Sequence, residues 1–170
     1  MTIHLLSADH RYQSLDEVAR LSRVDNLGPK LMRALPYLRG AVVVRTCNRL
    51  AILVDAPSRL AGSDAAPAGS DAAPAVADDV RAVLAHCTEL PLEQVHLRHL
   101  AGHQAHLDLF ATAAGLESMV VGEREIAGQL RRAFHAAWEE DTLSCDLGRA
   151  LEHASRTSRL VATHTGLASS

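Results

Sequence analysis

Two short apolar runs separated by four polar residues constrain this chain more than any other part of its sequence. Residues 41–45 read AVVVR and residues 50–54 read LAILV, and both are typical of strands buried in a core. The connector between them is Thr46-Cys47-Asn48-Arg49. A polar connector of this length favours a tight turn, so the sequence predicts a β-hairpin with Cys47 near its turn.

The residues before the hairpin predict one strand and two helices. Ile3 to Ala8 has the pattern of a short strand. Ser14 and Glu17 have the spacing of a capping box, which begins a helix. A second helical run covers Pro29 to Leu38, and we expect Pro36 to kink or shorten it.

The residues after the hairpin are mostly helical by pattern. We expect a helix over residues 78–90 with Asp78 as its N-cap, a strand over 95–100, and helices over 102–114, 123–139 and 144–163. The first part of the chain therefore runs β-α-β-β-α-β, and the last third is all helix. This order predicts an α+β fold, with an antiparallel sheet that has helices on one face, followed by a C-terminal helical bundle.

Residues 56–77 differ in composition from the rest of the chain. The segment AGSDAAP at 61–67 is repeated without change at 68–74. Small residues in such a repeat cannot build a core. We therefore expect a flexible surface loop at 56–77, inside a single domain that covers residues 1–170.

Composition argues against several classes of protein. A formal net charge of −3, with 17 Lys and Arg against 20 Asp and Glu, does not suit a general nucleic-acid coat, although it allows a small tRNA footprint. No apolar run reaches the roughly 18 residues that a membrane span needs, and the N-terminal residues do not resemble a signal peptide. Three widely spaced cysteines form neither a disulfide framework nor a metal knuckle. We therefore expect a cytoplasmic protein with no membrane partner.

Cys47 is the strongest candidate for chemistry. A thiolate is a good nucleophile when it is exposed and its pKa is lowered, and a turn that also carries Arg49 offers both conditions. The alternative is that Cys47 is a small buried apolar residue beside a strand. Cys87 and Cys145 lie in expected helices, where a structural role is the simpler interpretation.

A group of histidines has the spacing of a metal-binding helix face. His99 and His103 are four residues apart, and His106 follows three residues later. No carboxylate or cysteine is placed to complete a ligand set. We therefore predict no metal site, and interpret these histidines as solvated residues near helix ends.

Residues 113–129 combine an apolar run with several polar residues. Glu123 and Glu125 open an expected helix, and acids in a first turn favour the helix dipole without any ligand. The alternative is a polar pocket for an amino-acid substrate, formed by these acids together with Ser118 and Gln129.

Three segments together resemble the glutamyl-tRNA reductase family. They are Thr46-Cys47-Asn48-Arg49, the run GLESMVVGE at 115–123 followed by Gln129, and LVATHT at 160–165, which lacks both arginines of the family's closing R-x-R-T-x-T. The first two are specific as a pair in their order and separation, and such a pair makes sense only if the two segments meet in the fold. The resemblance covers nearly the whole chain except the repeat-bearing loop.

The resemblance implies an α+β catalytic domain whose cysteine attacks the ester carbonyl of glutamyl-tRNA. A thioester forms, tRNA leaves, and NADPH held by a separate Rossmann domain reduces the thioester to an aldehyde, a precursor of tetrapyrroles. By this match Cys47 is the nucleophile. The residues at or beside the family's substrate-binding positions are Thr46, Asn48, Arg49, Ser118, Glu123, Glu125 and Gln129.

The chain departs from the family pattern at several polar positions. Ala51 stands where the family usually has Glu, and Glu123-Arg124-Glu125 stands where Glu-Pro-Gln is common. Asp108 stands where a His important for activity usually precedes Leu-Phe, which makes Asp108 a candidate auxiliary residue. His106 cannot simply replace that His, because it lies about 200° around a helix from it. From these changes we hypothesise that an amino acid other than glutamate is loaded.

The resemblance also bears on cofactors. No G-x-G-x-x-G follows any expected strand, and the sequence ends at Ser170, where the family's nucleotide-binding domain would begin. We therefore expect that this chain binds no cofactor itself and that NADPH is met only through a further domain or a partner.

Three functions fit these observations. The leading hypothesis is aminoacyl-tRNA-dependent acyl transfer, in which Cys47 forms a thioester and a small-molecule acceptor takes the acyl group. The second is the catalytic domain of a glutamyl-tRNA reductase, completed by an NADPH domain or a reductase partner. The third is a non-catalytic homologue that binds tRNA or a reductase.

Overall fold

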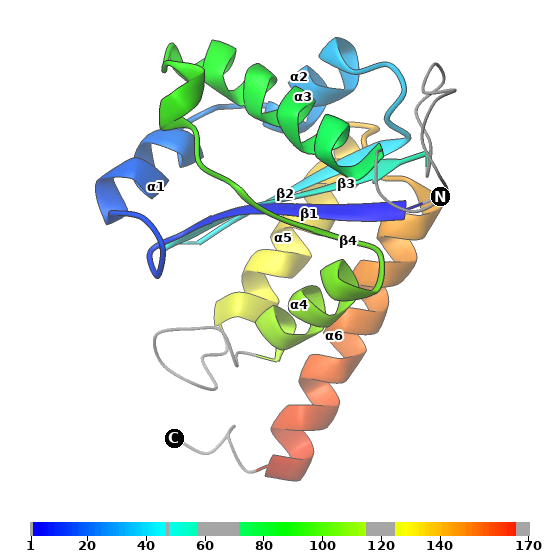
Figure 1. Ribbon diagram of the computed structural model, residues 1–170. Coiled ribbons are helices and arrows are strands. Elements are labelled where there is room, and N and C mark those ends of the chain that lie inside the picture. Colours follow the sequence, from blue (N-terminus) through cyan, green and yellow to red (C-terminus); the bar gives the residue numbers. More distant parts are fainter. Residues whose placement is uncertain (1, 47, 58–71, 115–124, 166–170) are drawn as a thin grey trace.

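The computed structural model describes residues 2–46, 48–57, 72–114 and 125–165. Its centre is a four-stranded antiparallel sheet in the order β2-β3-β1-β4, with helices on both sides (Figure 1). The strands are β1 (Thr2–Asp9), β2 (Gly40–Arg45), β3 (Arg49–Ala56) and β4 (Arg98–Ala101). The helices are α1 (Leu15–Ser22), α2 (Leu27–Ala34), α3 (Ala72–Thr88), α4 (His103–Ala113), α5 (Glu125–Glu139) and α6 (Cys145–Thr165), with a 3₁₀ turn at Leu92–Gln94. Over the described residues, none of these helices has the length and apolar character to cross a bilayer.

The expected hairpin is present. β2 and β3 pair antiparallel from Gly40 opposite Asp55 to Arg45 opposite Leu50. β1 pairs with β3 along all eight of its residues, whereas β4 pairs only with His4–Ser7 of β1. All eight residues of β3 are buried, because it has a strand on each side and apolar core on each face.

The sheet carries an apolar core on each face. On one face Leu6 and Ile52 pack with residues of α1, α2 and α3, and on the other Leu5 and Leu53 pack with residues of α4, α5 and α6. The α+β class and the strand and helix order are as expected. Our expectation of helices on only one face is wrong, because the C-terminal helices cover the second face. The reason is that the apolar residues of the strands, as at 50–54, run without alternation and so give two faces that both need covering.

Local signals explain one end of each of the first two helices. The Ser14 hydroxyl accepts a hydrogen bond from the Glu17 amide at 3.2 Å, and the Glu17 carboxylate accepts one from the Ser14 amide at 2.8 Å, which is the expected capping box. α2 ends at Ala34, well before Leu38. Pro36 explains the early end, because the residue before a proline avoids helical dihedral angles.

Other element ends differ from expectation. α3 begins at Ala72, so residues 72–77 are helical, and Asp78 forms an ion pair with Arg81 at 3.1 Å within the helix instead of capping it. Residues 58–71 of the expected loop lie outside the described residues. β4 begins only at Arg98, after the 3₁₀ turn.

Gly40 marks a close approach between the sheet and the connection from α5 to α6. A Cβ atom at Gly40 would lie 2.7 Å from the Ser144 amide nitrogen and 2.9 Å from the Thr142 carbonyl oxygen. That carbonyl also accepts from the Ala41 amide at 2.8 Å, so the backbone cannot easily move apart. We predict that Gly40→Ala lowers the free energy of unfolding by about 1–3 kcal/mol, measured by urea unfolding.

Gly148→Ala is the matched control for this prediction. Gly148 lies inside α6, where a Cβ atom would meet Leu143 at an ordinary 3.8 Å. Alanine is the better helix former, so this change should raise the free energy of unfolding by up to about 1 kcal/mol. A stability loss at Gly148 as large as that at Gly40 would contradict the steric explanation.

Candidate active site

The turn of the β2–β3 hairpin is held together by its own side chains. The Thr46 amide donates to the Arg49 carbonyl at 2.9 Å, which closes the turn. The Thr46 hydroxyl donates to Oδ1 of Asn48 at 2.8 Å and accepts from the Asn48 amide at 3.3 Å. The Asn48 carbonyl accepts from the His10 amide at 3.1 Å, which ties the end of β1 to the turn. Cys47 lies outside the described residues.

Arg49 begins β3 with a buried guanidinium that contacts both β1 and α4. The residue is only 5% exposed. Its Nε and Nη2 lie 2.9 and 2.8 Å from Oδ2 of Asp9, at the end of β1. Its Nη1 donates to the Thr112 hydroxyl and lies 3.7 Å from Oδ2 of Asp108, both on α4. Arg49 therefore connects the hairpin to two other elements of the fold.

Asp9 accepts hydrogen bonds from a second arginine. Arg11 donates to the Asp9 carboxylate through its amide at 2.9 Å and through its guanidinium at 2.9–3.2 Å. Burial alone would raise the pKa of Asp9, but the hydrogen bonds from Arg11 and the charge of Arg49 outweigh burial and lower the pKa to about 2. Asp9 is therefore a carboxylate at neutral pH.

Asp108 adds a third arginine to this group. Its Oδ1 accepts from Nη1 of Arg98 at 2.8 Å, whereas its buried Oδ2 has no hydrogen-bond partner among the described residues. The side chains of Arg11, Arg49, Arg98, Asp9 and Asp108 are called the arginine cluster below. Guanidinium groups held in this way suit the recognition of a carboxylate.

Sequence reasoning missed most of the arginine cluster. Asp9 and Arg49 are forty residues apart, and Arg49 and Thr112 are sixty-three apart. No local motif marks such pairs. The one available signal was that Asp9 directly follows the expected strand at 3–8 and that Arg98 lies within the expected strand at 95–100.

A small cavity lies beside the turn, and its lining shows which segments meet there. Its volume is about 10 Å³, close to the space of one water molecule. It is lined by Leu5, Val44, Thr46, Arg49, Ala51, Leu53, Leu109, Thr112 and Leu130. Leu130 belongs to α5, so the first turns of α5 lie next to the hairpin turn.

The other candidate residues are placed only in part. Ser118 and Glu123 lie outside the described residues, and Glu125 is the first residue of α5. Gln129 precedes Leu130 and is half-buried. Its Oε1 is buried and has no hydrogen-bond partner in the described part of the chain.

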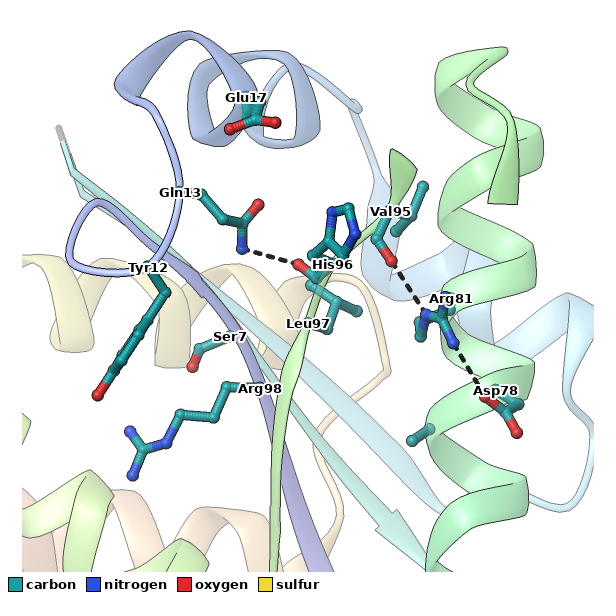
Figure 2. Close-up of a pocket in the computed structure, with 11 residues that line it drawn as sticks. Ser7, Tyr12, Gln13, Glu17, Asp78, Arg81, Val95, His96, Leu97 and Arg98 are labelled. Carbon is teal, nitrogen blue, oxygen red and sulfur yellow. Dashed lines mark hydrogen bonds and ion pairs between the residues drawn. The ribbon is translucent and has the colours of Figure 1, made fainter. Parts of the chain in front are cut away.

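A larger cavity of about 650 Å³ lies along the edge of β1, where β4 begins (Figure 2). Ser7 and Arg98 lie opposite each other on β1 and β4, and Figure 2 shows Tyr12 across from them. The Ser7 hydroxyl is buried without a hydrogen-bond partner among the residues described. Because Arg98 lines this cavity and also binds Asp108, the cavity adjoins the arginine cluster.

The histidines are arranged differently from the helical spacing we considered. His99 lies on β4 and stacks on His4, with ring centroids 5.3 Å apart and 3.0 Å between Nε2 of His99 and Nδ1 of His4. Burial and the neighbouring His99 lower the pKa of His4 to about 4, and burial also lowers the pKa of His99. Within the described ranges, no three His, Cys, Asp or Glu side chains are arranged to hold a metal ion.

Comparison with known proteins reveals close relatives. A family model described as "Glutamyl-tRNAGlu reductase, N-terminal domain" matches residues 6–165. The chain is 43% identical over 172 residues to the glutamyl-tRNA reductase of Micrococcus luteus and 39% identical over 166 residues to that of Cutibacterium acnes. These matches cover 98% and 96% of this chain but only 35% and 34% of the relatives, so the chain spans about a third of their length.

A solved structure agrees with the fold. The glutamyl-tRNA reductase from Methanopyrus kandleri matches 95% of this chain and 34% of its own with a TM-score of 0.71, at 21% sequence identity. The fold and the arginine cluster define an α+β domain with a charged site at one end of its sheet. With the sequence matches above, the chain belongs to the glutamyl-tRNA reductase N-terminal domain family.

The arginine cluster makes a prediction about stability and pH. Asp9→Asn should lower the free energy of unfolding by about 3 kcal/mol or more at neutral pH, because it removes one partner of a buried ion pair. The folded pKa of Asp9, about 2, lies below the ordinary 3.8, so its contribution is present above about pH 4 and is lost as pH falls through about 2. Urea unfolding between pH 7 and pH 2 measures both effects.

Asp16→Asn is the control for this measurement, because Asp16 is exposed on α1. We expect it to change the free energy of unfolding by less than about 0.5 kcal/mol. The Asp9→Asn protein should lose less stability than the wild type between pH 4 and pH 2. Parallel pH curves for the two proteins would refute the assignment.

Proposed function

We propose that this chain is the catalytic domain of a glutamyl-tRNA reductase and that Cys47 takes the acyl group of an aminoacyl-tRNA as a thioester. The observation that carries this proposal is the Thr46–Arg49 turn, which is tied to β1 and α4 through the arginine cluster in a chain of this family. The relatives from Micrococcus luteus and Cutibacterium acnes bear the name glutamyl-tRNA reductase. We extend that activity to this chain as the proposal.

The proposed chemical step is an acyl transfer to sulfur. The Cys47 thiolate attacks the ester carbonyl carbon and a C–S bond forms. The C–O bond to the terminal ribose breaks, and the ribose oxygen takes a proton as tRNA leaves. Arg49 follows Cys47 by two residues, and positive charge beside a cysteine favours its thiolate over its thiol.

In this proposal Arg49 fixes the turn beside the substrate and does not move protons. A guanidinium stays charged at all working pH values and binds carboxylates through paired N–H groups. Asp9 holds Nε and Nη2, which directs Nη1 toward Thr112 and Asp108. Thr46 and Asn48 keep the turn closed, and we assign Gln129, Ser118, Glu123 and Glu125 to the surroundings of the acyl group. Asp108 is a positioning residue that acts through Arg98 and Arg49.

We also propose that the 650 Å³ cavity receives the terminal nucleoside of the tRNA. Its volume lies within the range of small-molecule sites. Tyr12 on its wall is 67% exposed, which suits stacking against a base, and Arg98 and Arg81 suit contacts with phosphate. The His10–Asn48 hydrogen bond keeps this wall next to the turn.

We propose that this chain does not itself bind a dinucleotide cofactor. The sequence contains no G-x-G-x-x-G, so it lacks the glycine-rich turn that places a pyrophosphate at a helix N-terminus. We propose that reduction of the thioester to an aldehyde uses NADPH bound outside these residues, by another part of a longer protein or by a partner.

The family matches favour the reductase over acyl transfer to another acceptor, which was the leading hypothesis from sequence. No contact among the described side chains specifically favours a small-molecule acceptor or a non-catalytic role in binding tRNA. A cytoplasmic location remains part of the proposal.

The central test is acylation of the cysteines. We predict that the protein mixed with charged tRNAs gains the mass of one aminoacyl group and that Cys47→Ser abolishes the gain, because a serine hydroxyl is far less ionised at neutral pH. Intact-mass analysis with peptide mapping measures this and also identifies the amino acid loaded. The controls are Cys87→Ser and Cys145→Ser, which should gain the aminoacyl group as the wild type does. Cys87 is half-buried in α3, and Cys145 is exposed on α6. Full acylation of Cys47→Ser would remove the central claim.

The proposed nucleoside site has its own test. Tyr12→Ala should raise the tRNA concentration needed for half-maximal acylation by roughly 5- to 150-fold, because loss of one base stack costs about 1–3 kcal/mol. The maximal rate of acylation at saturating tRNA should change little. Trp138→Ala, which removes an aromatic ring 70% exposed on α5, is the control and should leave the tRNA dependence unchanged. Identical tRNA dependence in the Tyr12 variant would rule this site out.

A further inference from the structure

A second polar cavity lies at the opposite end of the sheet from the Thr46–Arg49 turn. Its volume is about 490 Å³, and Asp55 of β3 lies in its wall with residues of β1, α4 and α6. Asp55 follows Arg49 by six residues on the same strand, so the two are about 20 Å apart along β3. The cavity is therefore separate from the candidate active site.

Asp55 is the feature that needs explaining. It is 1% exposed, and neither of its carboxylate oxygens has a hydrogen-bond partner among the described residues. Leaving a buried carboxylate without a partner is strongly unfavourable, and folded proteins rarely do so. A carboxylate in the wall of a cavity of this size is most simply satisfied by a ligand that donates hydrogen bonds and carries positive charge.

His106 adds a second acceptor to this cavity. Its Nδ1 lies 2.8 Å from the Gly102 carbonyl oxygen, which can only accept, so Nδ1 carries the proton. In the neutral ring, Nε2 is then left as an acceptor. The ring also packs edge-on against Phe110, with centroids 6.4 Å apart, and Phe110 supplies an aromatic wall that attracts cations.

We infer that this cavity binds the primary ammonium group of a small organic molecule, with Asp55 as its counter-ion. Asp55 and His106 line the same cavity, and their acceptors, two carboxylate oxygens and one ring nitrogen, equal in number the three N–H groups of an ammonium ion. Asp146 of α6 adds a second carboxylate, and Arg149, exposed on the same helix, can receive an anionic group carried by the ligand. A metal ion fits less well, because no three ligating side chains converge within the described residues.

The test compares ligands by the shift of the thermal unfolding midpoint and by changes in the His106 imidazole signals in NMR. The probes are putrescine, which offers ammonium groups alone, and L-glutamate, which adds carboxylates for Arg149. Tetramethylammonium is the control, because it carries the charge without any N–H group. We expect putrescine, L-glutamate or both to raise the midpoint by several degrees at millimolar concentration and tetramethylammonium to have no effect. A midpoint unchanged by both putrescine and L-glutamate up to about 10 mM would overturn the proposal.

Asp55→Asn gives the sharper result. Without a ligand, the Asp55→Asn protein should be at least as stable as the wild type, because the substitution removes an uncompensated charge. The same variant should bind the effective probe at least about tenfold more weakly. Asp146→Asn, at a half-buried position, provides a second variant if Asp55→Asn does not fold, and it should also weaken binding. Asp16→Asn on α1 should bind as the wild type does. Undiminished binding by both cavity variants, or a carbon-13 signal showing that Asp55 is an uncharged acid, would refute the proposal.

Discussion

The buried ion pair between Asp9 and Arg49 is the interaction on which the candidate active site depends. It joins the last residue of β1 to the first residue of β3, directly beside the turn that contains Cys47. Through Thr112 and Asp108 the same guanidinium reaches α4, so one side chain connects both sheet strands to the helical layer. Because the pair is buried, breaking it would leave an uncompensated charge away from water and would greatly lower the stability of the fold. The turn is therefore anchored to a buried and ion-paired part of the fold.

Helices cover both faces of the sheet, and this arrangement explains how the Thr46–Arg49 turn is held in position. β3 is buried on both faces and paired on both edges, so both of its ends are held by neighbouring strands and by packed helices. One end carries Arg49 and the other carries Asp55, and both side chains lie in cavities on the face covered by α4, α5 and α6. One strand thus contributes to two separate cavities, a small one beside Arg49 and a larger one beside Asp55.

Local patterns predicted much of the fold and little of the arginine cluster. The hairpin, the capping box at Ser14 and the strand and helix order follow from short-range spacing, which a single sequence displays directly. The second helical layer was missed because an unbroken apolar run does not say what covers each face. His99 was considered on a helix with His103, but His99 lies on β4, which ends at Ala101, and α4 begins at His103. Contacts such as Asp9 with Arg49 cross forty residues of sequence, and no local pattern encodes them.

The stacked pair of His4 and His99 has a consequence for the edge of the sheet. The two rings share one hydrogen bond between β1 and β4, so the proton position on one imidazole fixes the tautomer of the other. Their lowered pKa values mean that the unfolded chain binds more protons than the folded one below about pH 6.5, and stability therefore falls as pH drops toward about 4. Protonation of both rings would place two positive charges next to each other across the pairing of β1 and β4, so this edge of the sheet is the part most directly opposed by acid.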